Sequence, residues 1–153
     1  MPEVRAAYLL ERYGIARPPV PDGLIYLIGA PRLIVRLSAD LPEELPGVLV
    51  WGKNTDIIWL RQQDSIERRR FSMWHEGGHW LLHEGSFYMM AYGTEEQETE
   101  REANAFAAAL LMPEPWLHEY GPRVNWKPWA MAPRFGVSHA AMRRRLRDLG
   151  LPS

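Results

Sequence analysis

The fold is decided by one stretch, which reads Phe71-Ser72-Met73-Trp74-His75-Glu76-Gly77-Gly78-His79-Trp80-Leu81-Leu82-His83. On a helix, His79 lies roughly 40° around the axis from His75 and one turn along it, so both imidazoles can face one metal ion. Glu76 lies on the same side, where a carboxylate can take a proton from an activated water and return it to a leaving amine. The pattern predicts a helix that carries two metal ligands, His75 and His79, and a catalytic carboxylate, Glu76.

The remaining residues of this helix predict a core element beside a cleft. An apolar stripe next to the histidines consists of Phe71, Trp74, Leu81 and Leu82. Gly77 and Gly78 each cost about 1 kcal/mol relative to alanine in a helix interior, so we expect close packing or a local widening there. His83 lies one turn after His79 on the same side, and a place in the cleft wall is favoured over a role as fourth ligand.

A second helix is expected to supply the third ligand that a catalytic zinc usually has. Thr94 and Gln97 indicate a capping box at its start, and Pro113 ends it. Its apolar arc consists of Ala103, Phe106, Ala107, Leu110 and Leu111.

The position of each glutamate relative to that arc distinguishes the candidates. Glu100 lies inside its edge, whereas Glu98 and Glu102 project roughly 100° or more from its centre. Glu100 is therefore the predicted third ligand, the alternative being a solvated charge like its neighbours. Asn104, one turn further, faces the same way and is predicted to bond the far nitrogen of a ligand histidine.

Taken together, these residues resemble the ImmA/IrrE metallopeptidases. The matching residues are His75-Glu76-Gly77-Gly78-His79, then Glu100-x-x-Ala103-Asn104-x-Phe106-Ala107-x-x-Leu110-Leu111-Met112-Pro113, with Arg69-Arg70-Phe71 ahead of them. The resemblance covers most of the chain and departs from the family at Gly77, where a large apolar residue is usual. It implies a gluzincin-like endopeptidase, with Glu100 as third ligand, that cleaves a helix-turn-helix repressor and so releases stress-response or mobile-element genes.

Composition limits the metals and the compartment. With 153 residues and 46% hydrophobic content, the chain can build one domain with a real core. It has no cysteine, so histidine and carboxylate are the strong ligands, and zinc is expected first, with manganese or another divalent ion second. The start lacks the features of a signal peptide, and no apolar run approaches the ~20 residues of a membrane span. We expect a cytoplasmic protein without a membrane partner.

Three strand-like runs precede the histidine helix, at residues 33–37, 47–51 and 56–60, with a hairpin loop at residues 52–55. The expected class is α+β, mainly helical and zincin-like, with a small three-stranded sheet. An edge strand of such a sheet can hold an extended peptide by main-chain hydrogen bonds, but a purely structural sheet is an equal alternative for any one strand. The basic run Arg68–Arg70 is typical of a solvated helix start.

The loop at residues 85–93 is apolar and is expected mostly to fill the core. Tyr88 and Tyr92 within it are weak candidates to stabilise an oxyanion.

The C-terminal residues 123–153 are predicted to form a helix-turn-helix-like segment packed on a metallopeptidase domain of residues 1–122. Gly136 is expected in the turn and Ser138 at the N-cap of an arginine-rich helix. Pro128 and Pro133 are expected to interrupt the preceding helix. Packing or docking of a partner is favoured over DNA binding.

Two functional classes follow from these patterns. One is a metal-dependent peptidase that cleaves a repressor. The other is a regulator that binds a repressor or DNA through its C-terminal basic helix without cutting it. Indifference to a chelator would distinguish the second class from the first.

Overall fold

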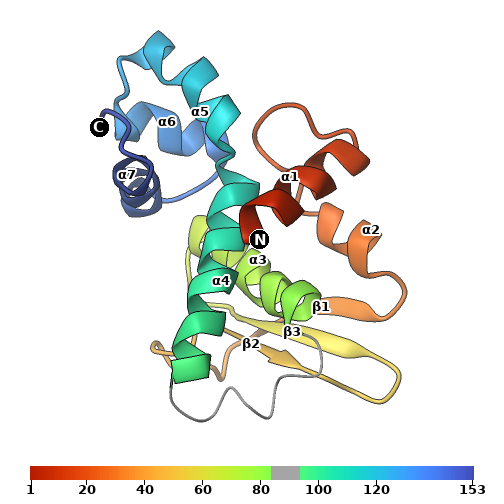
Figure 1. Ribbon diagram of the computed structural model, residues 1–153. Helices are drawn as coiled ribbons and strands as arrows, with labels where there is room; N and C mark the ends of the chain where they lie inside the picture. Colours follow the sequence, from red (N-terminus) through yellow and green to blue (C-terminus); the bar gives the residue numbers. More distant parts are fainter. Residues whose placement is uncertain (84–93) are drawn as a thin grey trace.

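The structure is a computed structural model that describes residues 1–83 and 94–153, without the side chains of residues 94–96. Its elements follow one another from the N-terminus to the C-terminus as shown in Figure 1. They are α1 (Pro2–Arg12), α2 (Leu24–Gly29), β1 (Leu33–Ser38), β2 (Gly47–Val50), β3 (Asp56–Arg61), α3 (Ile66–Leu82), α4 (Thr94–Leu111), α5 (Glu114–Tyr120), η2 (Pro122–Val124), α6 (Pro128–Phe135) and α7 (His139–Asp148).

The three predicted strands form one sheet in the order β1-β3-β2. The outer strand β1 runs parallel to β3, whereas β2 runs antiparallel to it and pairs Gly47 with Leu60. Helix α3 contacts both β2 and β3, so one side of the sheet supports the helix that carries the histidines. The α+β class with a small three-stranded sheet is confirmed.

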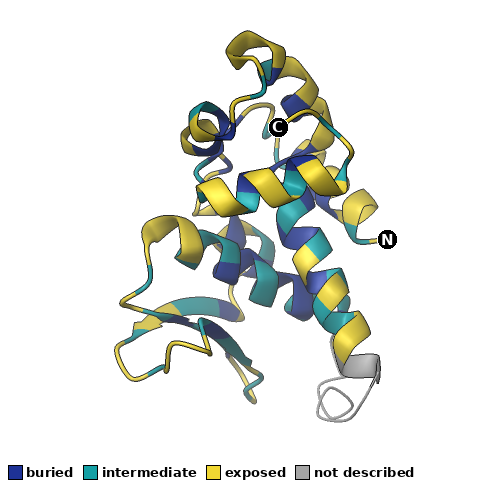
Figure 2. Cartoon of the chain, turned by 90° about the vertical axis from the view of Figure 1, so that its left-hand side faces the viewer, coloured by how far each residue is buried: buried dark blue, intermediate teal, exposed yellow. Residues whose placement is uncertain are grey.

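Helices α3 and α4 lie against each other and form the centre of the molecule (Figure 1). Trp74 of α3 and Phe106 of α4 are fully buried, with ring centroids 6.5 Å apart. The whole predicted apolar arc of α4 is buried, from Ala103 to Leu111. Figure 2 shows the buried positions where these helices meet and the exposed positions on their outer faces.

The C-terminal segment is a pair of helices joined by a tight turn. Gly136 ends α6 with a positive φ of 68°, and the Ser138 side chain caps α7 by accepting from the backbone N–H of Ala141. The expectation that prolines interrupt α6 is wrong, because Pro128 begins that helix and Pro133 lies inside it. At the first position of a helix a proline lacks only an N–H that has no helical partner there, which accounts for Pro128 but not for Pro133. The boundary at residue 122 stays a prediction.

In the part of the chain that the structure describes, none of the helices is long and apolar enough to cross a membrane.

Candidate metal centre

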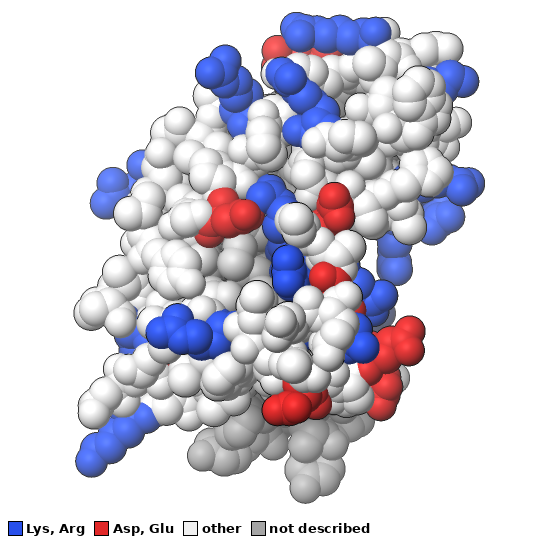
Figure 3. All heavy atoms as spheres, turned by 180° about the vertical axis from the view of Figure 1, so that it is seen from behind, with Lys and Arg blue, Asp and Glu red and all other residues white. Residues whose placement is uncertain are grey.

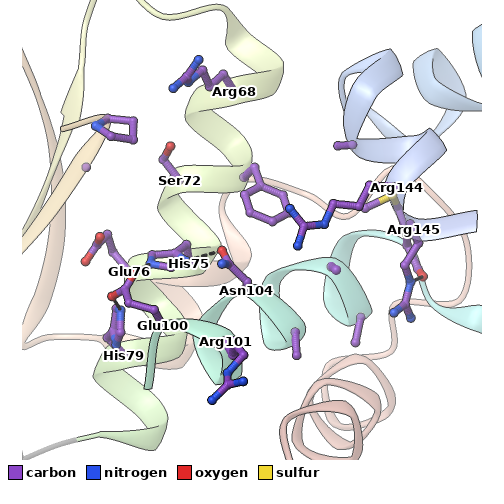
Figure 4. Close-up of a pocket in the computed structure, with 18 of the residues that line it drawn as sticks. Arg68, Ser72, His75, Glu76, His79, Glu100, Arg101, Asn104, Arg144 and Arg145 are labelled. Atoms are coloured by element: carbon purple, nitrogen blue, oxygen red, sulfur yellow. Dashed lines mark hydrogen bonds and ion pairs between the residues drawn. The ribbon is translucent and has the colours of Figure 1, made fainter. Parts of the chain in front are cut away.

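Helix α3 presents two imidazoles to one carboxylate of α4. His75 Nε2 lies 3.0 Å from Glu100 Oε2, and His79 Nε2 lies 2.7 Å from Glu100 Oε1. One ligand atom from each of these three residues lies within 4.8 Å of the others. Figure 4 shows the three side chains pointing toward one another from the two facing helices. Two imidazole nitrogens and a carboxylate are a donor set that suits zinc and related cations, so these residues can hold a metal ion.

The second nitrogen of each imidazole is held by another side chain. His75 Nδ1 lies 2.8 Å from Asn104 Oδ1, and His79 Nδ1 lies 3.0 Å from His83 Nδ1. These contacts leave the Nε2 atom of each ring turned toward Glu100. Metal-binding histidines normally have their outer nitrogen fixed in this way, so the surroundings also fit a metal site.

The charges in the site favour an ionised carboxylate. Hydrogen bonds from His75 and His79 hold the pKa of Glu100 well below its usual range. Burial lowers the pKa of His75, but the hydrogen bond and the charge of Glu100 outweigh it, so the net pKa is raised. The Glu100 side chain is 46% exposed, so its negative charge faces the solvent from which a cation would arrive.

Glu76 lies beside the histidines at the edge of β2. Burial raises its pKa, the charge of Glu100 adds to this effect, and His75 and His79 oppose it. A Cβ atom at Gly47 of β2 would lie 3.3 Å from Glu76 Cγ, so the glycine lets the strand approach this carboxylate closely. A carboxylate that holds its proton more readily than usual suits proton transfer near neutral pH.

The three converging side chains open into a long cleft of about 1560 Å³. Its walls come from α3, α4, β2 and α7, and Figure 4 shows Arg144 of α7 at the end far from His79. At 1.5 Å rise per residue, the wall from Glu100 of α4 to Met112, directly after α4, is about 18 Å long. Such a cleft has room for several residues of an extended polypeptide.

The structure brings together most of the residues predicted for the site. His75, His79, Glu100 and Asn104 form one connected cluster, and His83 lines the cleft next to His79. Tyr88 and Tyr92 lie outside the described residues, as does the rest of the loop at residues 85–93.

Two residues of the site escaped the sequence reasoning. Glu102 points away from the centre of the apolar arc, yet its Oε1 lies 3.4 Å from His83 Nε2. The length of the glutamate side chain carries the carboxylate back to the site, which a helical wheel of Cα positions does not show. Nothing in the sequence around Gly47 predicts its contact with Glu76, because only the folded sheet brings the two residues together.

Comparison with known proteins agrees with this geometry. The family model of the IrrE N-terminal-like domain, peptidase M78, matches residues 34–147. Among proteins with curated annotation, none matches the chain in sequence.

A solved structure with the same fold is a Mycobacterium tuberculosis transcriptional regulator, at a TM-score of 0.71 and 17% sequence identity. The match covers 95% of this chain and 46% of the regulator, so the chain spans about half of that protein's length. At this identity the similarity shows the fold alone. The family model, in contrast, matches most of the chain, and the chain therefore belongs to the IrrE N-terminal-like family of M78 peptidases.

Proposed function

We propose that this chain is a metal-dependent endopeptidase in which His75, His79 and Glu100 hold a zinc ion, with manganese or another divalent ion as the alternative. The observation that carries the proposal is the convergence of these ligand atoms within 4.8 Å, with Glu76 beside them at the edge of an open cleft. When bound, the cation would supply Lewis-acid chemistry, acidifying a water molecule and polarising a carbonyl.

Glu76 is the residue that moves the proton in this proposal. It takes a proton from the attacking water and gives it to the amine that leaves when the peptide bond breaks. Its raised pKa supports this role, because the carboxylate can hold the proton between the two steps. Asn104 orients His75 by accepting the hydrogen bond from Nδ1.

Strand β2 is suited to hold the substrate backbone. Arg61 N donates to Pro46 O, so the pairs of β2 with β3 alternate from this hydrogen-bonded position. The main-chain groups of Gly47 and Leu49 therefore point away from β3, toward the edge of the sheet that borders the cleft. An extended peptide that added to this edge would lie beside Glu76.

The proposed substrate is a helix-turn-helix transcriptional repressor, whose cleavage would release stress-response or mobile-element genes in the cytoplasm. Support comes from the family and from the name of the structurally similar protein, which is a transcriptional regulator.

Helix α7 supports a packing or docking role more than DNA binding. Arg145 donates to Met112 O, and Arg144 lines the cleft with its Nε 3.6 Å from Asp148. Figure 3 shows one face of the molecule on which Lys and Arg are dispersed among acidic and uncharged side chains. Arg145 is thus engaged within the protein, whereas Arg144 is largely exposed.

The first test of the proposal is the metal content of the purified protein by elemental analysis. We expect near-stoichiometric zinc or manganese in the wild type and about a tenfold or greater loss of metal affinity in Glu100→Ala. Glu98→Ala is the matched control, because Glu98 is exposed on the same helix. If the wild type binds no divalent metal, the proposed site is not a metal centre.

The second test is cleavage of repressors from the same organism by the metal-loaded protein, followed by mass spectrometry. Glu76→Gln keeps the ligands but removes the proton acceptor, so we expect it to retain metal and to lose cleavage by a factor of about 10² to 10⁴. Cleavage by Glu76→Gln at the wild-type rate would contradict the role of Glu76 in proton transfer. Repressor binding that survives both this substitution and a chelator would instead favour a regulator that does not cut.

A further inference from the structure

We propose that His83 and Glu102 are positioning residues that hold His79 in the orientation and tautomer with which it binds a metal. The inference rests on the proposed metal site and deepens it. His83 is not one of the three proposed ligands, and in this inference it acts on the metal site through its contact with His79.

The contacts form a chain that leads outward from the centre. His79 Nδ1 lies 3.0 Å from His83 Nδ1, and the two rings have centroids 5.1 Å apart at 51°. His83 Nε2 lies 3.4 Å from Glu102 Oε1. The side chains of His79 and His83 are only 5% and 7% exposed, so bulk water cannot readily replace the contact between the two rings. The Glu102 side chain is 42% exposed and reaches His83 from the surface of α4.

The protons along this chain follow from the donor and acceptor rules. A His79 that offers the Nε2 lone pair to a metal carries its proton on Nδ1, and this proton needs an acceptor. His83 Nδ1 can accept it only when the His83 proton is on Nε2. That proton in turn points to Glu102, and an ionised carboxylate can only accept. The carboxylate of Glu102 thereby fixes the tautomers of both histidines.

The other proposed ligand, His75, is held by a single amide side chain. Asn104 offers Oδ1 to His75 Nδ1, and an amide oxygen is always an acceptor. His83 has two neutral tautomers, and only one of them accepts from His79. This difference explains why a second group, Glu102, is needed on the His79 side and not on the His75 side.

A purely structural role for His83 predicts a different response to substitution. A side chain that only fills space at the end of α3 should be replaced best by an apolar residue of similar volume, such as leucine. A side chain that accepts a hydrogen bond should be replaced best by asparagine, whose Oδ1 occupies the place of Nδ1. The variants His83→Leu and His83→Asn therefore separate the two roles.

The test measures zinc affinity by competition with a chelator, in the absence of any peptide. We expect a loss of about 10-fold to 100-fold in His83→Leu and recovery to within about threefold of wild type in His83→Asn. Glu102→Leu should lose affinity in the same direction but less, and Glu98→Leu is its matched exposed control. In the zinc-loaded protein, NMR should detect an exchange-protected proton on His79 Nδ1 in the wild type and in His83→Asn, but not in His83→Leu.

Two results would overturn the inference. One is unchanged affinity in His83→Leu, and the other is an equal loss in His83→Asn and His83→Leu, which would mean that the ring itself is required for packing. Affinity and cleavage are measured separately. If His83→Leu loses zinc but the wild type cleaves nothing, the positioning role stands and the peptidase fails. If the wild type cleaves a repressor and the His83 variants bind zinc normally, the peptidase proposal stands and the positioning role of His83 fails.

Discussion

Asp56 is a single side chain on which three segments of the molecule converge. It is fully buried at the start of β3 and accepts hydrogen bonds from Arg32 Nε at 2.8 Å, Trp80 Nε1 at 2.8 Å and Gly52 N at 2.9 Å. Trp80 follows His79 directly in α3. The buried carboxylate thus ties the helix that carries the site to the sheet.

The charge of Asp56 should make the fold sensitive to acid. Burial alone would raise its pKa, but the bonds from Arg32, Trp80 and Gly52 outweigh it and lower the pKa below the usual value. A lowered folded-state pKa contributes stability that is complete above the unfolded-state pKa of about 3.9 and is lost as the pH falls through the folded-state value. We predict that Asp56→Asn lowers the free energy of unfolding by about 2–3 kcal/mol at pH 7.

Urea denaturation at pH 7, 5 and 3 checks this prediction. The difference between wild type and Asp56→Asn should shrink at the lowest pH, because the unfolded wild-type chain then binds a proton at Asp56 that the folded chain, with its lowered pKa, binds less readily. Asp40→Asn is the control, since Asp40 is exposed in a loop and should change stability by no more than about 0.5 kcal/mol. A difference that stays constant down to pH 3 would contradict a lowered pKa.

The contacts of Asp56 could not be predicted from the sequence, whereas the role of Glu100 could. Glu100 could be selected among its neighbouring glutamates because helical periodicity is local and the apolar arc of α4 is long. The partners Arg32 and Trp80 each lie 24 positions from Asp56, so only the folded chain brings them together. Local patterns therefore predicted the candidate metal ligands better than the contacts that tie their helix to the sheet.

At the scale of elements, the adjacent glycines of α3 let two different helices approach. A Cβ atom at Gly77 would lie 3.0 Å from Ile25 Cδ1 of α2, whereas one at Gly78 would lie 3.1 Å from Phe106 Cδ2 and 3.3 Å from Ala103 Cα of α4. The expected close packing is observed. Ile25 of α2 occupies the space beside Gly77 into which a larger side chain would extend.

The two glycines should respond differently to alanine. At Gly77 the obstacle is the end of a flexible side chain, so Gly77→Ala should be neutral or stabilise α3 by up to about 1 kcal/mol through helix propensity. At Gly78 the obstacle includes the backbone of α4, so Gly78→Ala should destabilise by about 1–3 kcal/mol through overpacking. Thermal and urea unfolding of the metal-free variants would check this contrast, and equal effects at both positions would contradict it.

At the scale of the whole molecule, Arg70 joins parts of the chain that are far apart in sequence. Its guanidinium donates to Gly136 O in the turn between α6 and α7, to Val20 O, and to the Asp22 carboxylate ahead of α2. The sequence favoured a solvated arginine here, which is wrong for Arg70, whose side chain is 12% exposed. A run of charged residues predicts that most of its members are exposed. It does not show which member bonds to carbonyl groups that are distant in sequence.

Through Arg70, helix α3 also holds the turn before α7, the helix at the far end of the cleft. We predict that Arg70→Met lowers the free energy of unfolding by about 2–3 kcal/mol, because it leaves two carbonyl groups without their charged donor. Hydrogen exchange should become faster in the turn around Gly136 and in the segment around Val20, while the centres of α3 and α4 stay protected. Arg69→Met is the matched control, since Arg69 donates to the nearby and exposed Gln62 O. If exchange around Gly136 is the same in both variants, α7 keeps its place without Arg70. Its packing against α6 and the bond from Arg145 to Met112 O then suffice to hold the wall of the cleft.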